Sequence, residues 1–451
     1  MIPQSLLDLG SAGFDLRSAG FDLRSALTPG PNGVRFGVFP VDGEPLDFVR
    51  AGSGLFEGAF YFSSPDGFAM GGLGIAASAS AGGVDRFARL RSAVDSWSLA
   101  EPFRAFTGFA FAPDGPRSEA WASFASAEAV LPMATVLRRG DERLLLVALP
   151  PDADAVDLTD RLNSLTTPPR PSYPNLGDHT LESCPSVSEW TTAVAEAVDA
   201  INDGSLRKVV LARSVIVRSD GAPDGFDLVS HLERSYRQCF SFGWRANGAT
   251  FVGASPELLV RLDRGVVSSN PLAGSAARGE GETEDRLLAH ELMQSAKDRI
   301  EHRFVVEDVA ARLAPFAEEV RVPERPSLKR MATVQHLSTR ITAVARPGTH
   351  VLDLVDALHP TPAVGGTTRD SANAFIAKVE TFDRGWYAGG IGWIDGTDEG
   401  EFAISLRCGL LEGTRAHLFA GAGIVEDSNP ESELLETRLK LRPMLELLAA
   451  T

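Results

Sequence analysis

The sequence predicts an α+β protein built mainly from antiparallel β structure. Its 451 residues are 44% hydrophobic and 23% charged, as is usual for globular proteins. Short apolar runs flank Pro-Asp-Gly turns in the N-terminal half, which is typical of β-hairpins. In the C-terminal half, β-rich runs and helical segments alternate without the regular βαβ order of a Rossmann fold or a TIM barrel. A large antiparallel architecture follows.

Charge and cysteine content restrict the class of partner and the location. The chain carries 43 Lys+Arg against 60 Asp+Glu, a formal net charge of −17. Nucleic acids and anionic membranes require a basic face, so neither is expected as a partner. No apolar run approaches the ~18 residues of a membrane span, and MIPQSLLDLG does not resemble a signal peptide. Cys184, Cys239 and Cys408 lie far apart without CxxC spacing, which predicts no disulfide or zinc site and a cytoplasmic location.

The N-terminal part divides into an extension and a first subdomain. Residues 11–24 repeat SAGFDLR in tandem, too few copies for a solenoid, and we interpret 1–28 as a mobile extension. Residues 29–178 are expected to form a β-rich subdomain of the same fold, with a hairpin at 56–74 and a buried strand at 142–150. The glycine-rich stretch 71–83 matches no nucleotide-binding motif and predicts tight turns and close packing.

A proline-rich segment, 166–178, predicts the boundary to a catalytic domain at 179–451. Directly after it, Ser186 and Glu189 have the spacing of a capping box and predict the start of a helix. The strands expected after this helix lie within 208–217, 248–262, 402–413 and 415–425, and the expected helices lie at roughly 284–313 and 431–448.

Two carboxylate pairs suggest a metal site. Asp298 and Glu301 are three residues apart on one predicted helix, and Glu433 and Glu436 are three apart on another, so each pair shares a helix face. A solvated acidic face explains either pair alone. If the two pairs meet, they require a cation, and the expected one is Mg²⁺, which prefers oxygen ligands.

Other residues have types and positions suited to acid–base chemistry and anion binding. Lys208 faces the apolar side of a predicted strand, where desolvation disfavours the charged form, so it is a candidate general base. Glu257 follows a Ser-Pro turn and leads into an apolar run, so it is a candidate general acid. A surface lysine and a solvated loop glutamate are the alternatives. Arg407 and the glycines in 421–423 could hold a carboxylate.

Together these residues resemble the chorismate-utilising enzyme family, which includes isochorismate, salicylate, anthranilate and aminodeoxychorismate synthases. The resemblance covers about 186–448 and implies large antiparallel sheets packed as a sandwich with flanking helices. The matching motifs, in order, are RKVVLAR, GASPELL, NPLAGSAARG, EDRLLAHELMQSAKDRIEH, VQHLSTRI, LHPTPAVGG, FDRGWYAGGIGW, SLRCG and GAGIVEDSNPESELLETRLKL.

The resemblance implies roles for individual residues. Lys208 corresponds to the base of water-using members and Glu257 to the general acid. Glu301 and Glu436 correspond to direct Mg²⁺ ligands, with Asp298 and Glu433 in the water-mediated shell. The residues that it places around the substrate are Gly274, Ser275, His336, Ala363, Tyr387, Arg407, Gly421, Ala422, Gly423 and Lys440. With Ala at position 363, this sequence resembles the synthases that stop at isochorismate, whereas lyase-competent members tend to carry Thr at this position.

The implied activity is a Mg²⁺-dependent, reversible conversion of chorismate to isochorismate, by attack of water at C2 with loss of the C4 hydroxyl. Salicylate synthesis with pyruvate elimination is the second expectation, and Ala363 weighs against it. Ammonia-dependent synthesis is third, and Lys208 weighs against it. A regulator that only binds chorismate is a further alternative. No obligatory protein partner and a monomeric state are expected, and FDRGWYAGGIGW favours menaquinone over siderophore biosynthesis.

Overall fold

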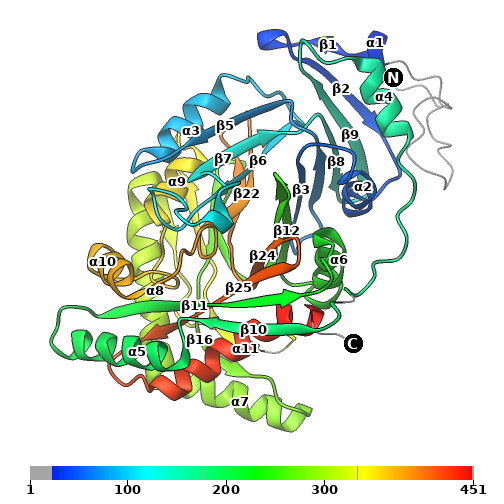
Figure 1. Ribbon diagram of the computed structural model, residues 1–451. Helices are drawn as coiled ribbons and strands as arrows, with labels where there is room; N and C mark the ends of the chain where they lie inside the picture. The colour runs from blue at the N-terminus through cyan, green and yellow to red at the C-terminus, as the bar shows by residue number, and fades with distance from the viewer. Residues whose placement is uncertain (1–22, 175, 333, 449–451) are drawn as a thin grey trace.

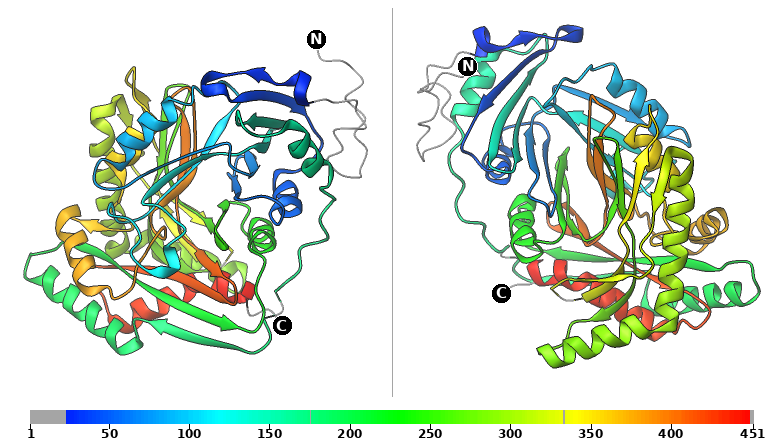
Figure 2. Two further views of the ribbon diagram at one scale, coloured as in Figure 1. Left: turned by 45° about the horizontal axis from the view of Figure 1, so that its top comes forward. Right: turned by 180° about the vertical axis from the view of Figure 1, so that it is seen from behind.

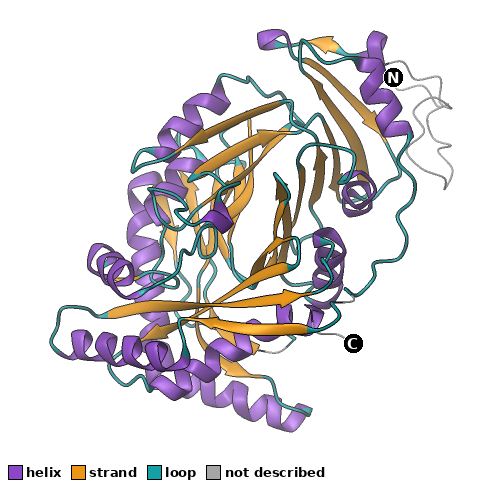
Figure 3. Cartoon of the chain, viewed as in Figure 1, coloured by secondary structure: helices purple, strands orange, loops and turns teal. Residues whose placement is uncertain are grey.

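Two large antiparallel sheets face each other and a third, smaller sheet extends one end of the molecule (Figures 1 and 3). This computed structural model describes residues 23–174, 176–332 and 334–448. The predicted α+β sandwich with flanking helices is confirmed. Residues 1–22, which hold most of the SAGFDLR repeat, lie outside the described residues, so the interpretation of 1–28 as a mobile extension stays a prediction. The rest of that segment contains a short helix at Leu23–Ala26 and the start of a strand at Thr28.

The first sheet has 13 strands, and all its pairings are antiparallel. Along the sheet the strands are β1 (Thr28–Pro29), β2 (Arg35–Pro40), β9 (Glu142–Leu149), β8 (Ala134–Arg139), β4 (Ala69–Leu73), β3 (Ala59–Ser63), β12 (Phe240–Ala246), β13 (Ala249–Ser255), β24 (Cys408–Glu412), β25 (Arg415–Ile424), β11 (Lys208–Ser219) and β10 (His179–Cys184). The two-residue β21 (Gly366–Thr367) pairs with β11 outside this path.

The second sheet has nine strands and the third has three. The order in the second is β17 (Ala317–Arg321), β20 (Ile341–Ala345), β15 (Val266–Asn270), β14 (Leu258–Asp263), β23 (Gly400–Ile404), β22 (Gly390–Asp395), β6 (Arg104–Phe109), β7 (Ala127–Leu131) and β5 (Ala77–Ala81). The third consists of β16 (Leu272–Ala277), β19 (Val334–Ser338) and β18 (Ser327–Arg330).

Aromatic side chains fill the space between the two large sheets. Phe60 on β3 and Phe106 on β6 belong to different sheets, and their ring centroids are 5.6 Å apart. Trp244 on β12 lies edge-on to Phe60 and to Trp386, which precedes β22. All four side chains are almost completely buried. Such burial is the main favourable contribution to folding, because apolar area is removed from water.

Helices cover the outer faces of the sheets. Against the first sheet pack α2, α6, α5 and α11, whereas α3, α8 and α9 pack against the second. Their bounds are α1 (Leu23–Ala26), α2 (Pro45–Gly52), α3 (Arg86–Asp95), α4 (Ala155–Asn163), α5 (Val187–Asn202), α6 (Gly225–Ser235), α7 (Glu282–Gln294), α8 (Ala296–Leu313), α9 (Val351–Leu358), α10 (Arg369–Val379) and α11 (Pro430–Leu448). In both views of Figure 2, the red α11 lies against strands at one end of the sandwich.

Strands from both sides of the proline-rich segment share each large sheet. In the first sheet β3 pairs with β12, with Phe62 opposite Phe242. In the second, β6 pairs with β22, with Phe106 opposite Trp393. The segment 166–178 itself connects α4 with β10. The N-terminal half therefore completes the sheets that carry the C-terminal half.

Several local predictions can be compared with the elements. The Ser186–Glu189 capping box is confirmed at the start of α5, and the hairpin at 56–74 forms β3 and β4. The single helix expected over 284–313 is wrong. It is broken at Ser295, whose non-helical backbone ends α7 and whose hydroxyl accepts the backbone N–H of Asp298, capping α8.

Within the described ranges, none of the helices combines the length and apolar character that crossing a membrane requires. Cys184, Cys239 and Cys408 are free thiols.

Candidate active site

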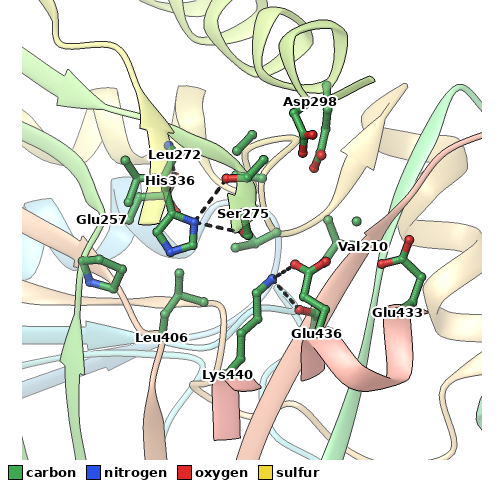
Figure 4. Close-up of a pocket in the computed structure, with 18 of the residues that line it drawn as sticks. Val210, Glu257, Leu272, Ser275, Asp298, His336, Leu406, Glu433, Glu436 and Lys440 are labelled. Atoms are coloured by element: carbon green, nitrogen blue, oxygen red, sulfur yellow. Dashed lines mark hydrogen bonds and ion pairs between the residues drawn. The ribbon is translucent and has the colours of Figure 1, made fainter. Parts of the chain in front are cut away.

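A pocket opens where β16, α8, β25 and α11 meet, and Figure 4 shows it in close-up. Its walls come from segments more than 200 residues apart, because β11 and β25 are neighbours in the first sheet while α8 packs on β16 and α11 packs on β25. Its lining residues are Val210, Pro256, Glu257, Leu272, Ala273, Gly274, Ser275, Lys297, Asp298, Glu301, His336, Ala363, Val364, Tyr387, Leu406, Arg407, Gly421, Gly423, Glu433, Glu436 and Lys440.

The structure brings together nearly all the predicted site residues. Lys208 and Ala422 do not line the pocket themselves. Ala422 lies between Gly421 and Gly423 on β25, so its side chain points to the opposite face of the sheet and is fully buried in the core. Only its backbone can therefore face a ligand.

Lys208 lies directly behind the pocket wall. It begins β11 and is 1% exposed, and its Nζ is 2.9 Å from Oε1 of Glu301, which lines the pocket. Gly423 allows this approach. A Cβ at that position would come within 2.6 Å of the Glu301 carboxylate and 3.2 Å of Cε of Lys208. A side chain at position 423 would therefore displace the ion pair.

Glu257 lies in the turn between β13 and β14 and is almost completely buried. Burial raises the pKa of its carboxyl to about 7, because desolvation disfavours the charged form. The backbone N–H of Leu272, which donates to Oε1 at 3.3 Å, and the cations of Lys208, Lys329 and Arg407 oppose that rise in pKa. Near neutral pH this group can therefore act as a proton donor.

The four predicted metal-binding carboxylates come from α8 and α11 and line one pocket. Figure 4 labels Asp298, Glu433 and Glu436 among them. Burial raises the pKa of Asp298, and the nearby carboxylates of Glu301 and Glu436 add to the effect. Burial and the neighbouring Glu436 raise the pKa of Glu433 to about 7. Burial also acts to raise the pKa of Glu436, but the Lys440 ammonium outweighs it and holds that pKa below its usual value.

Three of these four carboxylates form an ion pair with a lysine. Besides the Lys208–Glu301 pair, Nζ of Lys440 lies 2.6 Å from Glu436, and Nζ of Lys297 lies 3.6 Å from Glu433. Lys440 also donates to the carbonyl oxygen of Gly421 at 2.9 Å, which ties α11 to β25.

The donor set fits Mg²⁺, because four carboxylates on two facing helices offer the hard oxygen ligands that this ion prefers. The present side-chain conformations pair these groups with lysines. Within the described ranges, the one trio of acidic and histidine side chains whose ligand atoms all lie within 4.8 Å of one another is Asp95, His350 and Asp398, and none of these lines the pocket. Coordination by the four carboxylates therefore requires their side chains to reorient.

Polar groups on the remaining walls are available to a ligand. His336 on β19 has Nδ1 3.0 Å from the Ser275 hydroxyl and 3.3 Å from the Gly274 carbonyl, whereas its buried Nε2 has no hydrogen-bond partner among the described residues. Burial lowers the pKa of His336 well below its usual value, so the ring is neutral. The Arg407 side chain has no hydrogen bond or ion pair in the described part of the chain, which suits a guanidinium that binds a carboxylate.

Tyr387 and Ala363 complete the wall beside β25. The Tyr387 hydroxyl is so close to Gly421 that a Cβ there would come within 2.9 Å of it. Burial raises the pKa of this phenol, so it remains protonated. Ala363 lies next to the buried Val364 in the segment that leads to β21.

Sequence reasoning missed Lys297 and Lys329. Lys297 directly precedes Asp298 in SAKDRIEH, so its position in a conspicuous motif was a usable signal. Lys329 on β18 donates to the carbonyl oxygen of Pro256 at 2.6 Å, next to Glu257. This contact depends on the pairing of β18 with β19, for which the local sequence offers no signal.

A sandwich of antiparallel sheets with a pocket of cations, carboxylates and a buried acid defines an enzyme that binds a small anionic molecule. The chain belongs to the chorismate binding enzyme family, whose model matches residues 37–449.

Relatives support this assignment over nearly the whole chain. The salicylate biosynthesis isochorismate synthase of Pseudomonas aeruginosa is 40% identical over 432 residues, covering 92% of this chain and 89% of that protein. The isochorismate synthase MenF of Bacillus subtilis is 42% identical over 260 residues, 58% of this chain and 55% of that protein. The solved structure of MenF, the menaquinone-specific isochorismate synthase from Escherichia coli, matches with a TM-score of 0.81 and 26% identity, covering 93% and 96% of the two chains.

Proposed function

We propose that this enzyme is a Mg²⁺-dependent isochorismate synthase, which converts chorismate reversibly to isochorismate. The observation that carries the proposal is the arrangement of Lys208 and Glu257 about one pocket, which also holds four carboxylates and the unpaired Arg407 guanidinium. The names of the relatives support the same reaction.

In the proposed reaction, the ion pair between Lys208 and Glu301 opens. Lys208, in its neutral form, then accepts a proton from a water molecule that attacks ring C2 of chorismate. The ring double bonds shift, and the bond from C4 to its hydroxyl breaks. Glu257, kept protonated by burial, donates its proton to the leaving hydroxyl, which departs as water. One water molecule enters and one leaves, so substrate and product have the same composition. The reverse reaction uses the same two residues with their roles exchanged, and the conversion is therefore reversible.

The other polar groups bind and orient the substrate. Arg407 and the backbone of 421–423 hold a substrate carboxylate, and Lys440 keeps α11 against β25. Glu301 and Glu436 would hold Mg²⁺ directly, with Asp298 and Glu433 acting through water. When bound, Mg²⁺ supplies positive charge between these carboxylates and an anionic substrate.

The experiment is incubation of purified protein with chorismate and Mg²⁺, without ammonia, with chromatographic resolution of products and a separate pyruvate assay. Isochorismate alone, lost on addition of a chelator, is the expected result. Salicylate with stoichiometric pyruvate would show that Ala363 does not prevent lyase activity. Turnover only with ammonia would contradict the role of Lys208, and Mg²⁺-dependent chorismate binding without turnover would indicate a regulator.

The pathway and location are inferences of the same kind. Relatives named for salicylate biosynthesis and for menaquinone both match the chain, so the preference for menaquinone stays a prediction. The cytoplasmic location and the monomeric state also stay predictions.

A further inference from the structure

We propose that Arg384, held by Glu380, is a positioning residue that fixes two walls of the active-site pocket and thereby sets the affinity and orientation of chorismate. The identity of the substrate rests on the proposed function above. Arg384 lies just before β22, and its side chain is 4% exposed. It does not line the pocket, so it would act through other residues.

The Arg384 guanidinium joins two separate segments of pocket wall. Its terminal nitrogens donate to the carbonyl oxygen of Val210 at 2.8 Å and to that of Val364 at 2.9 Å. Val210 lies on β11, two residues after Lys208 and on the same face of the strand, and Val364 follows Ala363. Both valines line the pocket. One side chain therefore sets the separation of these walls.

Glu380 fixes the guanidinium itself and makes a third connection. Its carboxylate accepts from Nε of Arg384 at 2.8 Å and from a terminal nitrogen, a bidentate arrangement that is stronger and more directional than a single contact. The same carboxylate accepts the backbone N–H of Ala212 on β11 at 2.8 Å. The Phe111 ring lies 4.2 Å from the guanidinium carbon and packs against its face.

The wall at 363–364 has few other attachments to β11. The pairing of β21 with β11 is two residues long, and the backbone N–H of Val210 donates to the carbonyl oxygen of Gly365 at 2.7 Å. The hydrogen bonds of Arg384 to Val210 and Val364 are therefore a main connection between β11 and the segment at 363–364. Arg384 and Glu380 also line a second cavity of about 570 Å³.

Lysine cannot replace this arginine. The guanidinium presents five N–H groups in a fixed planar fork, whereas an ammonium is a point charge with three donors. Here the guanidinium donates four hydrogen bonds in different directions, two to the Glu380 carboxylate and one to each of two backbone carbonyl oxygens. Arg384→Lys therefore keeps the charge but releases at least one wall.

The chain offers a matched control in Arg50. This arginine is 5% exposed and contacts two carboxylates, that of Asp227 at 2.6 Å and that of Asp47 at 3.2 Å. It also donates to one distant backbone carbonyl, that of Pro169, at 2.7 Å. Neither Arg50 nor Asp227 lines the pocket. Arg50→Lys should therefore lower the melting temperature to a similar extent without moving the pocket walls.

The test measures kcat and KM for chorismate in both variants, together with Tm. The dissociation constant for chorismate is measured by calorimetry in the Lys208→Ala background, where turnover is slow. For Arg384→Lys we expect kcat/KM to fall about 10²-fold, as misplacement of a positioning element can cause, with KM and Kd each rising about tenfold. Arg50→Lys should retain kcat/KM within about threefold.

Each outcome decides the proposal. Wild-type kinetics in Arg384→Lys, or an equal loss in Arg50→Lys, would overturn it. If Arg384→Lys does not fold, Glu380→Asp serves instead, because the shorter carboxylate cannot reach both Arg384 and Ala212; a Kd equal to that of wild type would then overturn it. If the wild type binds chorismate without converting it, the proposed function fails and the Kd comparison still tests Arg384. If it neither binds nor converts chorismate, both proposals fall.

Discussion

Nζ of Lys208 lies 2.9 Å from Oε1 of Glu301, so the candidate base on β11 and a candidate metal ligand on α8 form one buried ion pair. The pair connects the first sheet to the helix that closes the pocket. Without a bound cation, removal of Lys208 would leave Glu301 without a counter-charge, so Lys208 variants are compared with wild type at saturating Mg²⁺.

Lys208→Ala should lower kcat by about 10²- to 10⁴-fold while leaving chorismate binding close to that of wild type, because a positioned base contributes that much to rate. Steady-state kinetics and calorimetric binding would measure the two effects. Lys378→Ala, an exposed lysine on α10, is the control and should behave as wild type. Near-normal turnover in Lys208→Ala would remove Lys208 from the role of base.

The pH dependence of the reaction should report Glu257. Burial raises the pKa of this carboxyl from 4.5 to about 7, so the proton donor is present below that pH and is lost as the pH rises through it. Above that value, kcat/KM for chorismate should fall up to tenfold per pH unit. The kcat/KM of the reverse reaction should fall in parallel, because a reaction without net proton uptake has an equilibrium constant that does not depend on pH.

Glu257→Gln should abolish this alkaline limb and cost about 10²-fold or more in rate. The matched control is Glu401→Gln, since Glu401 is another buried glutamate whose pKa burial raises to about 7, but it lies outside the pocket. A limb that persists in Glu257→Gln, or disappears in Glu401→Gln, would assign the titration to another group.

Gly423→Ala should disturb the site with little effect on the rest of the fold. The added Cβ would lie 2.6 Å from the Glu301 carboxylate, so that side chain must move away from Lys208. We expect kcat/KM to fall about 10²-fold, since small displacements of catalytic groups have effects of this size. At Gly54 a Cβ meets no atom within 4 Å, so Gly54→Ala should retain wild-type kinetics. Equal kinetics for both variants would show that the Glu301 position is unimportant.

The sequence was enough to predict residues that share a local pattern or a family motif. The i,i+3 carboxylate pairs and the segment 421–423 are of this kind. The four carboxylates and both glycines line one pocket, whereas the side chain of Ala422 does not. Strand alternation alone predicts that exception, because neighbouring residues on a strand point to opposite faces.

The remaining features depend on tertiary contacts between distant segments. The bond from Lys329 to Pro256 and the bonds from Arg384 to Val210 and Val364 join strands whose pairing no local pattern specifies. The break at Ser295 was missed for a different reason. Helical spacing continues through the break, and a serine inside such a pattern is as compatible with a helix interior as with a cap.

Removal of Lys297 should strengthen Mg²⁺ binding to the substrate-free protein. Its ammonium lies 3.6 Å from Glu433, so an entering cation must displace it from that carboxylate. The lysine side chain is 43% exposed, and such pairs contribute at most about 1 kcal/mol. Lys297→Met should therefore bind Mg²⁺ up to about fivefold more tightly, since 1.4 kcal/mol corresponds to a factor of ten.

Calorimetric titration with Mg²⁺ in the absence of chorismate measures this change in affinity directly. Lys378→Met removes the same charge far from the carboxylates and should change the affinity less. An unchanged or weaker affinity in Lys297→Met would show that the pair does not compete with the cation, and an equal gain in both variants would attribute the effect to net charge.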